Sequence, residues 1–510
     1  MLASVTTCGV WGVDGHMVRV EVDLARGIPA FATVGLPEAA VREAKDRVRA
    51  AIRNSGYQFP AHRITVNLAP ATLKKEGAGY DLPIALGILT AAGLIDKERL
   101  QGYAVAGELS LDGSVLPVRG ILPMVLTARD QGLPRFMVPA GNCAEAAVVK
   151  GIDILAVERL DQALEHLTGH CCIEPVQMDL ARLFSACRES PVDFLEMRGQ
   201  EHVKRAMEVA AAGSHNVLLS GSPGSGKTMA ARRLPTILPD LTMEEALETT
   251  RVYSTAGLLS GETPLMVQRP FRSPHHTVSD AGLIGGGQQP RPGEVSLAHN
   301  GVLFLDEFPE FKKHVLEVLR QPMEDGVVSI SRASASLSFP ARFMMVAAMN
   351  PCPCGHLGDS HRQCSCSPVQ IQRYRARISG PLLDRIDMHI QVPPVAVAEL
   401  TKLAPGEASA VIRERVNRAR QVQITRFNTV DRIHGNAQMT PELLQRHCRL
   451  DTRGRTLLER AITGLGLSAR ASHRILKIAR TIADLDGADE LQPGHLAEAV
   501  QYRRFQLPDQ

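Results

Sequence analysis

The chain has 510 residues, of which 44% are hydrophobic and 22% charged, and its formal net charge at neutral pH is +3. This composition is typical of a folded globular protein, and the length favours roughly three domains. The near-neutral charge excludes a chain that is strongly basic or acidic throughout. No apolar run reaches the roughly 18 residues of a membrane-spanning helix, and the N-terminus lacks the basic and apolar segments of a signal peptide. We therefore expect a cytoplasmic protein with no membrane partner.

The first domain is predicted to span residues 1–165 and to mix strands with helices. Its apolar and charged periodicities predict, in chain order, a strand at Met17–Asp23, a helix at Glu38–Asn54, and a strand at Ile64–Leu68. Two further strands, at 105–111 and 115–118, flank Asp112-Gly113, a dipeptide that strongly favours a hairpin. A polar connection at residues 166–196 follows this domain.

A phosphate-binding loop is predicted near the start of a second domain, at residues 197–394. A short apolar strand at Asn216–Ser220 precedes the loop, and a helix is expected from Thr228 to Leu234. The loop fits the pattern G-x-x-x-x-G-K-[ST], and its residues are Gly221, Ser222, Pro223, Gly224, Ser225, Gly226, Lys227 and Thr228. Glycines let backbone N–H groups converge on phosphate oxygens, and the helix N-terminus adds a favourable dipole. We expect Lys227 to contact the β- and γ-phosphates of ATP and Thr228 to ligate Mg²⁺.

A pair of carboxylates forms the second part of this predicted site. The apolar stretch 301–305 ends in Asp306 and Glu307. Such a run predicts a buried parallel strand, and ligands of open α/β sheets bind at the carboxyl ends of such strands. We expect Asp306 to complete the Mg²⁺ shell and Glu307 to polarise the attacking water. The alternative is an acidic pair that begins a helix, which the position about 80 residues after Lys227 disfavours.

Four cysteines lie within 15 residues of each other, as Cys352-x-Cys354 and Cys364-x-Cys366. Four thiolates are a ligand set for tetrahedral Zn²⁺, so a zinc site is predicted. The C-x-C spacing is tighter than the usual C-x₂-C, and two histidines between the pairs can replace a thiolate. Reduced free cysteines in a glycine-rich loop are the alternative.

Helical patterns dominate a third domain, predicted at residues 395–510, with breaks near Gly406 and Gly435. Residues 411–480 carry 15 Lys and Arg against 5 Asp and Glu, a local excess of 10 positive charges. Such an excess fits a nucleic-acid surface, and it also fits the solvated faces of ordinary helices.

Several long stretches resemble the magnesium-chelatase-like family of AAA+ ATPases, which includes the competence protein ComM and the YifB proteins. The resemblance covers essentially the full chain, and its most specific stretches are Phe271–Thr277, Gly285–Gly287, Pro292–Asn300, Asn350–Gly355 and Gly380–Asp387. It implies an α/β fold in which an AAA+ P-loop ATPase core carries a helical lid and follows an α+β domain.

The resemblance also implies roles for three polar residues outside the phosphate loop. Asn350, which follows an apolar strand at 343–348, matches sensor 1, a residue that orients the attacking water. Arg385 matches the arginine finger, which neutralises charge on the nucleotide of a neighbouring subunit, and Arg470 matches sensor 2 in the lid. A finger supplied between subunits implies a homo-hexameric ring. For each arginine, a surface ion pair is the alternative.

Two segments match parts that line the pore of such rings. The first is the long segment Gly257–Gly293, which matches an insert, and the second is Glu324–Arg332, which matches a hairpin before sensor 1. Long inserted loops are usually functional. Arg332 and the glycines at 285–287 are therefore candidate DNA contacts.

The first domain resembles the Lon-protease-like domain of the ribosomal S5 superfold, through Gly107–Gly113 and Val115–Pro123. The Ser-Lys dyad of that family is missing, because Pro123 stands at the lysine position and the turn Gly77–Asp81 contains no serine. The resemblance therefore implies a non-proteolytic module that binds DNA or a partner.

Taken with the family resemblance, these features favour an ATP-dependent hexameric DNA motor. The expected activity is that of a helicase that promotes branch migration of recombination intermediates during natural transformation and homologous recombination. The implied cofactors are ATP and Mg²⁺, with Zn²⁺ at the cysteines, and the implied partner is single-stranded or branched DNA. Two alternatives stay open: an ATP-driven protein-remodelling ATPase, and a motor subunit of the magnesium-chelatase type.

Overall fold

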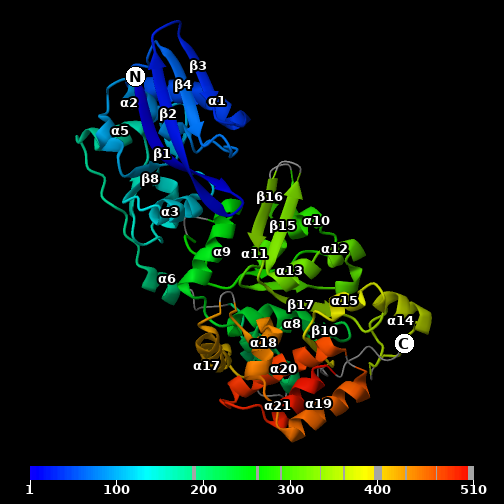
Figure 1. Cartoon of the computed structure of the whole chain (residues 1–510). Coiled ribbons are helices and arrows are strands. Elements are labelled where there is room, and N and C mark those ends of the chain that lie inside the picture. The colour runs from blue at the N-terminus through cyan, green and yellow to red at the C-terminus, as the bar shows by residue number, and fades with distance from the viewer. Residues whose placement is uncertain are drawn as a thin grey trace.

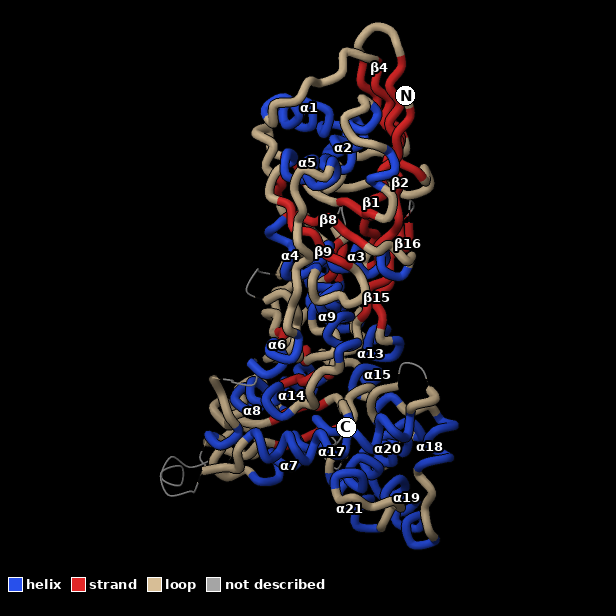
Figure 2. The backbone as a smooth tube through the Cα atoms, turned by 90° about the vertical axis from the view of Figure 1, so that its left-hand side faces the viewer, coloured by secondary structure: helices blue, strands red, loops and turns tan. Residues whose placement is uncertain are grey.

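The structure is a computed structural model that describes residues 1–186, 191–259, 263–287, 290–332, 335–359, 362–394, 405–430, 433–466 and 468–503. Three parts follow one another along a long axis (Figures 1 and 2). The N-terminal part, blue and cyan in Figure 1, lies at one end, an α/β part lies in the middle, and the C-terminal helices lie at the other end. None of the described helices is both long and apolar enough to span a bilayer.

A seven-stranded mixed sheet forms the N-terminal part, with the strand order β3-β4-β2-β1-β5-β8-β9. Its strands are β1 (Leu2–Trp11), β2 (Asp14–Ala25), β3 (Ala30–Val34), β4 (Arg63–Ala69), β5 (Tyr103–Val105), β8 (Arg135–Pro139) and β9 (Asp153–Val157). The helices of this part and of the connection after it are α1 (Ala39–Asn54), α2 (Asp81–Ala91), α3 (Ile121–Asp130), α4 (Cys143–Ala146), α5 (Leu160–Thr168) and α6 (Leu180–Ala186). The strand predictions at β2 and β4 and the helix prediction at α1 are confirmed.

The predicted hairpin at Asp112-Gly113 is present but shorter than expected. It consists of β6 (Glu108–Leu109) and β7 (Val115–Leu116), which pair only with each other. Asp81 lies in the turn that the resemblance matches to the dyad serine, and Pro123 stands at the position that it matches to the dyad lysine. Asp81 is fully buried and accepts a hydrogen bond of 2.6 Å from Arg47 Nε of α1, and Pro123 is buried in the first turn of α3.

The middle part contains a five-stranded parallel sheet with the order β11-β14-β17-β10-β18. Its strands are β10 (Val217–Ser220), β11 (Phe271–Arg272), β14 (Val302–Leu305), β17 (Met344–Met349) and β18 (Met388–Gln391). The helices around it are α7 (Glu201–Gly213), α8 (Lys227–Arg233), α9 (Met243–Ala256), α10 (Asp280–Ile284), α11 (Glu294–Leu297), α12 (Lys313–Glu317), α13 (Arg320–Asp325), α14 (Pro368–Arg375) and α15 (Gly380–Leu383). Every residue of β10, β14 and β17 is buried, as continuous apolar runs predict for parallel strands.

Two small hairpins stand apart from this sheet. One pairs β12 (Gly285–Gly286) with β13 (Arg291–Pro292), and the other pairs β15 (Val327–Arg332) with β16 (Ala335–Pro340). The segment predicted as one long insert also contributes β11 to the main sheet, so the projecting portion is shorter than expected. The side chain of Arg332, a candidate DNA contact, lies outside the described part of the chain.

The C-terminal helices share one core with the middle part. They are α17 (Ser409–Phe427), α18 (Pro441–His447), α19 (Thr452–Leu465), α20 (Ala469–Leu485) and α21 (Pro493–Gln501). Buried Val416 of α17 and Ile478 of α20 belong to the same cluster as Val209 of α7 and Val217 of β10. This continuous apolar core joins the helical part firmly to the sheet.

Part of the basic excess at 411–480 stabilises the fold from within. Arg426 and Arg480 both pair with buried Asp484, at 2.5 and 3.0 Å. Arg415 pairs with Glu208 at 2.5 Å, and Arg420 is buried. These four charges are therefore not available to a polyanion. The exposed arginines among the described residues of this segment are Arg418, Arg446, Arg449, Arg453, Arg455, Arg460 and Arg470.

The N-terminal part docks on α9 of the middle part (Figure 1). The Gly120 backbone N–H donates to the Ser254 carbonyl at 3.2 Å, and the Ser254 hydroxyl donates to Glu145. Burial raises the pKa of Glu145 above its usual range. Arg251 donates to the Val13 carbonyl at 3.2 Å, so the turn between β1 and β2 is held against α9.

Candidate nucleotide-hydrolysis site

Three neighbouring strands bring the predicted site residues to one edge of the sheet. β17 lies between β14 and β10, and all three run in parallel. Because the carboxyl ends of parallel strands meet at the same edge, the residues that follow them come together. Gly221 follows β10, Asp306 follows β14 and Asn350 follows β17.

The loop after β10 depends on its glycines. Gly224 and Gly226 have φ values of +77° and +94°, in the left-handed region that side chains other than glycine rarely adopt. A Cβ atom on Gly221 would lie 2.2 Å from the Val392 carbonyl oxygen, so the close approach to the strand after β18 also requires glycine. Helix α8 begins directly after Gly226, and its N-terminus faces the loop.

Lys227 lies folded into this loop. Its Nζ donates to the carbonyls of Gly221 at 2.7 Å and Ser222 at 2.9 Å, and to Asn350 Oδ1 at 3.3 Å. Burial lowers the pKa of Lys227 below its ordinary value, while the nearby Asp306 carboxylate raises it. The structure thus joins the predicted phosphate-contacting cation to the predicted sensor 1 residue directly.

The polar atoms of the loop fit a nucleotide phosphate chain. The hydroxyls of Ser222 and Ser225 are buried and have no hydrogen-bond partner among the described residues. Buried hydroxyls without partners destabilise a protein, so such groups generally serve a ligand or water. Together with Lys227 and the N-terminus of α8, they form a set of donors suited to phosphate oxygens.

The predicted magnesium ligands also meet. Thr228 Oγ1 donates to Asp306 Oδ2 at 2.9 Å. A hydroxyl oxygen and a carboxylate oxygen are hard ligands of the kind Mg²⁺ prefers. These two residues therefore fit the ion that accompanies a bound nucleotide triphosphate.

Glu307 adopts an unusual backbone conformation and has a partner that the sequence did not predict. Its φ is +52°, and its backbone N–H donates to Asp306 Oδ1 at 2.9 Å. One of its carboxylate oxygens lies 3.3 Å from Nδ1 of His276. The His276 ring contacts Phe311 edge-on and lies against the ring of His275. His276 belongs to the stretch Phe271–Thr277, so the family motif was the only sequence signal for it.

Gln200 is a second residue at the site whose part the sequence did not predict. Its Nε2 donates to the Ser225 carbonyl at 2.9 Å and to the Pro393 carbonyl at 2.7 Å. It thereby ties the phosphate loop to the chain that follows β18. Its φ of +53° is rare for a residue other than glycine, and no sequence pattern marks such a conformation.

Arg385 does not lie beside the phosphate loop of its own chain. It lines a separate groove of about 890 Å³, together with Gly285–Gly287 and Ser329–Ser331 of the two small hairpins. Its side chain is only 9% exposed, because it pairs with Glu324 at 2.5 Å and donates to the Pro381 carbonyl at 2.7 Å. The structure therefore shows the ion pair that is the alternative to a finger, within a groove distinct from the phosphate loop.

Arg470 lies at the N-terminal end of α20 and is exposed. It forms no ion pair among the described residues, whereas Arg474, one turn further on, pairs with buried Asp387. Arg470 is thus held at the surface by a well-anchored helix, and the structure does not bring it to the other site residues.

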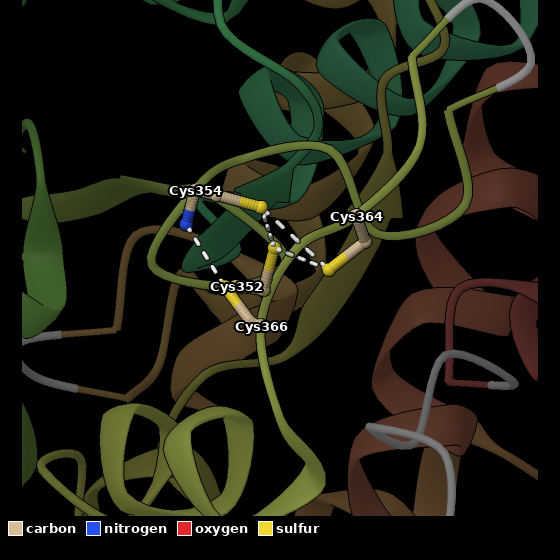
Figure 3. A group of neighbouring side chains, drawn as sticks. All are labelled: Cys352, Cys354, Cys364 and Cys366. Carbon is tan, nitrogen blue, oxygen red and sulfur yellow. Dashed lines mark hydrogen bonds between the residues drawn. The ribbon is translucent and has the colours of Figure 1, made fainter.

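The four cysteines converge in the loop between β17 and α14 (Figure 3). Their Sγ atoms all lie within 4.8 Å of one another. The separations of Cys352 from Cys354 and Cys364 are 3.4 and 3.6 Å, and Cys354 N–H donates to Cys366 Sγ at 3.3 Å. Hydrogen bonds from backbone N–H groups lower the pKa of Cys354 to about 5. The cluster has the ligand number and the chemistry of a zinc site.

A glycine-rich phosphate loop follows β10, two carboxylates follow β14, and an asparagine follows β17, the strand between them in the sheet. This combination defines a P-loop ATPase. Three comparisons with known families agree with this class. Residues 193–400 match "Magnesium chelatase, subunit ChlI", residues 20–142 match "Subunit ChlI of Mg-chelatase", and residues 406–503 match "Magnesium chelatase, subunit ChlI C-terminal".

The chain belongs to the magnesium chelatase ChlI family of AAA+ ATPases. It is 44% identical over 507 residues to competence protein ComM of Haemophilus influenzae, an alignment that covers 98% of this chain and 97% of the relative. It is also 44% identical over 504 residues to the uncharacterized protein YifB of Escherichia coli, with the same coverage. The magnesium-chelatase 38 kDa subunit of Cereibacter sphaeroides is 29% identical over 181 residues, which cover 32% of this chain and 54% of that subunit.

Proposed function

We propose that this chain is a ring-forming, ATP-driven DNA motor. In this proposal, a homo-hexamer acts as a helicase and promotes branch migration of recombination intermediates during natural transformation and homologous recombination. The observation that carries the proposal is the likeness to a competence protein over 98% of the chain, which includes the N-terminal part and both small hairpins. Competence is the uptake of external DNA, so a DNA substrate is the natural expectation.

The proposed hydrolysis reaction uses the site as follows. Lys227 and the N–H groups of the loop bind the phosphates of ATP, and Thr228 and Asp306 hold Mg²⁺, which when bound neutralises phosphate charge. Glu307 polarises the attacking water and Asn350 orients it. Arg385 acts as a finger on the nucleotide of a neighbouring subunit, and Arg470 acts as sensor 2.

The hairpins β12–β13 and β15–β16 support a motor that contacts its substrate near Arg385. Both line the groove that contains Arg385, so a displacement of either hairpin changes the surroundings of the proposed finger. The groove is lined by the carboxylates of Asp280, Glu317, Glu324 and Asp325 and by the cations of Arg320 and Arg385. The DNA contacts proposed here are Arg332 and the glycines at 285–287.

The first domain enters this proposal as a non-proteolytic module with a Lon-like, ribosomal S5 arrangement at residues 1–165. The connection at 166–196, the ATPase domain at 197–394 and the lid at 395–510 complete the proposed organisation. The lack of a serine in the turn at 77–81 and of a lysine at position 123 supports the loss of proteolysis, and Asp81 of that turn is paired with Arg47.

We rank a chelatase motor below the DNA motor. The chelatase subunit is 29% identical over 32% of this chain, whereas the competence protein is 44% identical over 98% of it. A protein-remodelling ATPase would use the same nucleotide site. The substrate that stimulates hydrolysis therefore distinguishes it from a DNA motor.

The deciding experiment measures ATP turnover with different macromolecules. We expect linear duplex, single-stranded DNA or synthetic three- and four-way junctions to raise kcat at least threefold at low salt. The stimulation should fall steeply with added salt, because binding to phosphates releases condensed counterions. An unfolded protein serves as the control substrate. Stimulation by the unfolded protein and none by any DNA would replace the DNA motor with a remodelling ATPase.

A further inference from the structure

The loop that carries the four cysteines begins beside the catalytic centre. Cys352 follows Asn350 by two residues and is fully buried, whereas the other three cysteines are half-buried. Helix α14 begins two residues after Cys366. The cysteines therefore lie in the loop between β17 and α14, and the first residue of this loop is Asn350, which contacts Lys227.

The sulfur positions match a tetrahedral metal site. With Zn–S bonds of about 2.3 Å, the sulfurs of a tetrahedral site lie about 3.8 Å apart. Three of the observed Sγ–Sγ separations are 3.4, 3.6 and 3.6 Å. All four cysteines are free, so no pair in the cluster forms a disulfide. The hydrogen bond from Cys354 N–H to Cys366 Sγ is the kind of outer contact that orients a thiolate ligand.

The histidines of the loop do not compete for the site in the described residues. His356 Nδ1 lies 3.4 Å from Asp359 Oδ2, and His356 is not among the residues whose ligand atoms converge within 4.8 Å of one another. His361, the second candidate, lies outside the described part of the chain. The four thiols alone already supply the number of ligands that a closed structural zinc site needs.

The same loop presses on the phosphate loop. Gly355 has a φ of +83°, and a Cβ atom placed on it would lie 2.6 Å from Pro223 Cδ. The backbone of the cysteine loop thus touches the phosphate loop directly, on the side that faces Asn350. Gly355 N–H also donates to the Cys352 carbonyl at 3.0 Å, which makes this contact part of the cysteine turn.

The far end of the loop holds Asn350 as well. Tyr374 of α14 is buried, and its hydroxyl lies near the backbone N–H of Asn350. Arg375 of the same helix donates to the Pro351 carbonyl at 3.2 Å. Joining Cys352 and Cys354 to Cys364 and Cys366 therefore fixes α14 and Asn350 with respect to each other.

We propose that the four cysteines bind one Zn²⁺ ion and that this site positions Asn350 and Pro223 for ATP hydrolysis. The zinc is structural in its coordination, because four thiolates leave no position open for water or substrate. Its effect on catalysis is exerted through Asn350 and the phosphate loop. The inference rests on the ATPase assignment and is independent of the nature of the motor's substrate.

The first experiment tests the metal. Full-length protein purified without a histidine tag should contain about one zinc per chain by elemental analysis. The double substitution Cys364→Ser/Cys366→Ser should abolish this zinc, whereas the exposed pair Cys171→Ser/Cys172→Ser should keep it. Replacement by Co²⁺ should give thiolate charge-transfer absorption in the wild type and in the control, but not in the cluster variant. A wild type that is folded, reduced and free of metal would overturn the site.

The second experiment tests positioning without removing a ligand. Gly355→Ala and Gly358→Ala introduce the same left-handed strain, at φ values of +83° and +77°, but only the first Cβ would meet another atom within 4 Å. We expect both variants to keep their zinc and both to bind ATP, and we expect kcat without DNA to fall at least fivefold more in Gly355→Ala. Equal kcat values in two folded variants would show that the cysteine loop does not position the nucleotide site.

A third measurement tests the role of zinc without a substitution, in case the Cys364→Ser/Cys366→Ser variant does not fold. Zinc is stripped reversibly from the wild type with a thiol-modifying reagent and a chelator, and both are then removed. We expect kcat to fall at least tenfold in the stripped protein, with a smaller change in KM, and to recover when Zn²⁺ is restored in the presence of Mg²⁺. Full activity of the stripped protein, with its fold intact by circular dichroism, would contradict the positioning role.

Discussion

At the scale of single residues, Glu307 and His276 form the contact with the greatest consequence for hydrolysis. Glu307 is held in a left-handed conformation, which costs roughly 1–2 kcal/mol for a residue with a side chain. Such strain is kept where the surroundings fix a residue for function. The 3.3 Å contact with His276 Nδ1 then sets the direction of the carboxylate.

We predict that His276→Ala lowers kcat more than it changes KM for ATP. Loss of a hydrogen bond to a charged group corresponds to a fall of roughly tenfold or more. His276→Gln, which keeps a hydrogen-bond donor, should recover part of the activity. The measurement is steady-state ATP turnover.

A double substitution supplies the control for this prediction. If His276 acts through Glu307, the combined His276→Ala/Glu307→Gln variant should be no slower than Glu307→Gln alone, because neighbouring residues that share one task are not additive. Additive losses would place the effect of His276 elsewhere.

Sequence motifs predicted Lys227, Thr228 and Asp306 because these residues lie in or directly after recognisable strand–loop patterns. They could not predict His276 or Gln200 as parts of the site. The contact of His276 with Glu307 joins residues 31 positions apart, and the contacts of Gln200 reach Pro393. Both depend on how separate segments close over the sheet edge, which no local pattern encodes.

At the scale of elements, the sequence predicts the central strands of the five-stranded parallel sheet but not its edge strand β11. β10, β14 and β17 are apolar runs of four to six buried residues, and such runs carry a strong signal. β11 has only two residues and exists because it pairs with β14. A strand of two residues that is defined by its neighbour has no periodicity of its own, so the sequence predicts one long insert around it.

The relation between α13 and α15 leads to a prediction about Arg385. Glu324, in the last turn of α13, pairs with Arg385 just after α15. If Arg385 is a finger, Arg385→Ala should bind ATP normally and lose ring-dependent hydrolysis, while Glu324→Gln should keep most of its turnover. If the ion pair alone mattered, both variants would lose activity to the same extent. The measurements are nucleotide affinity and ATP turnover.

Mixed rings test the same prediction between subunits. A Lys227→Ala subunit lacks the phosphate-binding cation but supplies a finger, and an Arg385→Ala subunit does the reverse. Mixing the two inactive proteins should therefore restore part of the activity at alternate interfaces. No recovery at any mixing ratio would contradict a finger that acts on a neighbour.

At the scale of the whole molecule, the N-terminal part is joined to the machinery that surrounds the site. The turn between β1 and β2 lies against α9, and a Cβ atom on Gly12 of that turn would lie 3.3 Å from Leu337 of β16. The β15–β16 hairpin, which lines the groove of Arg385, is thus in contact with the first domain. No sequence pattern indicates this docking, because Val13 and Arg251 are 238 residues apart.

The proposed DNA motor requires that ATP hydrolysis at the site moves branched DNA. The most direct measurement is the conversion of a synthetic four-way junction into its migrated products by the purified ring at low salt. The wild type should move the junction only with ATP. Glu307→Gln should bind both ATP and the junction but should not move it, because the amide keeps the shape of the carboxylate and loses the base. An active wild-type ATPase that binds the junction and leaves it unmoved, or a Glu307→Gln variant that moves it as fast as the wild type, would contradict the account.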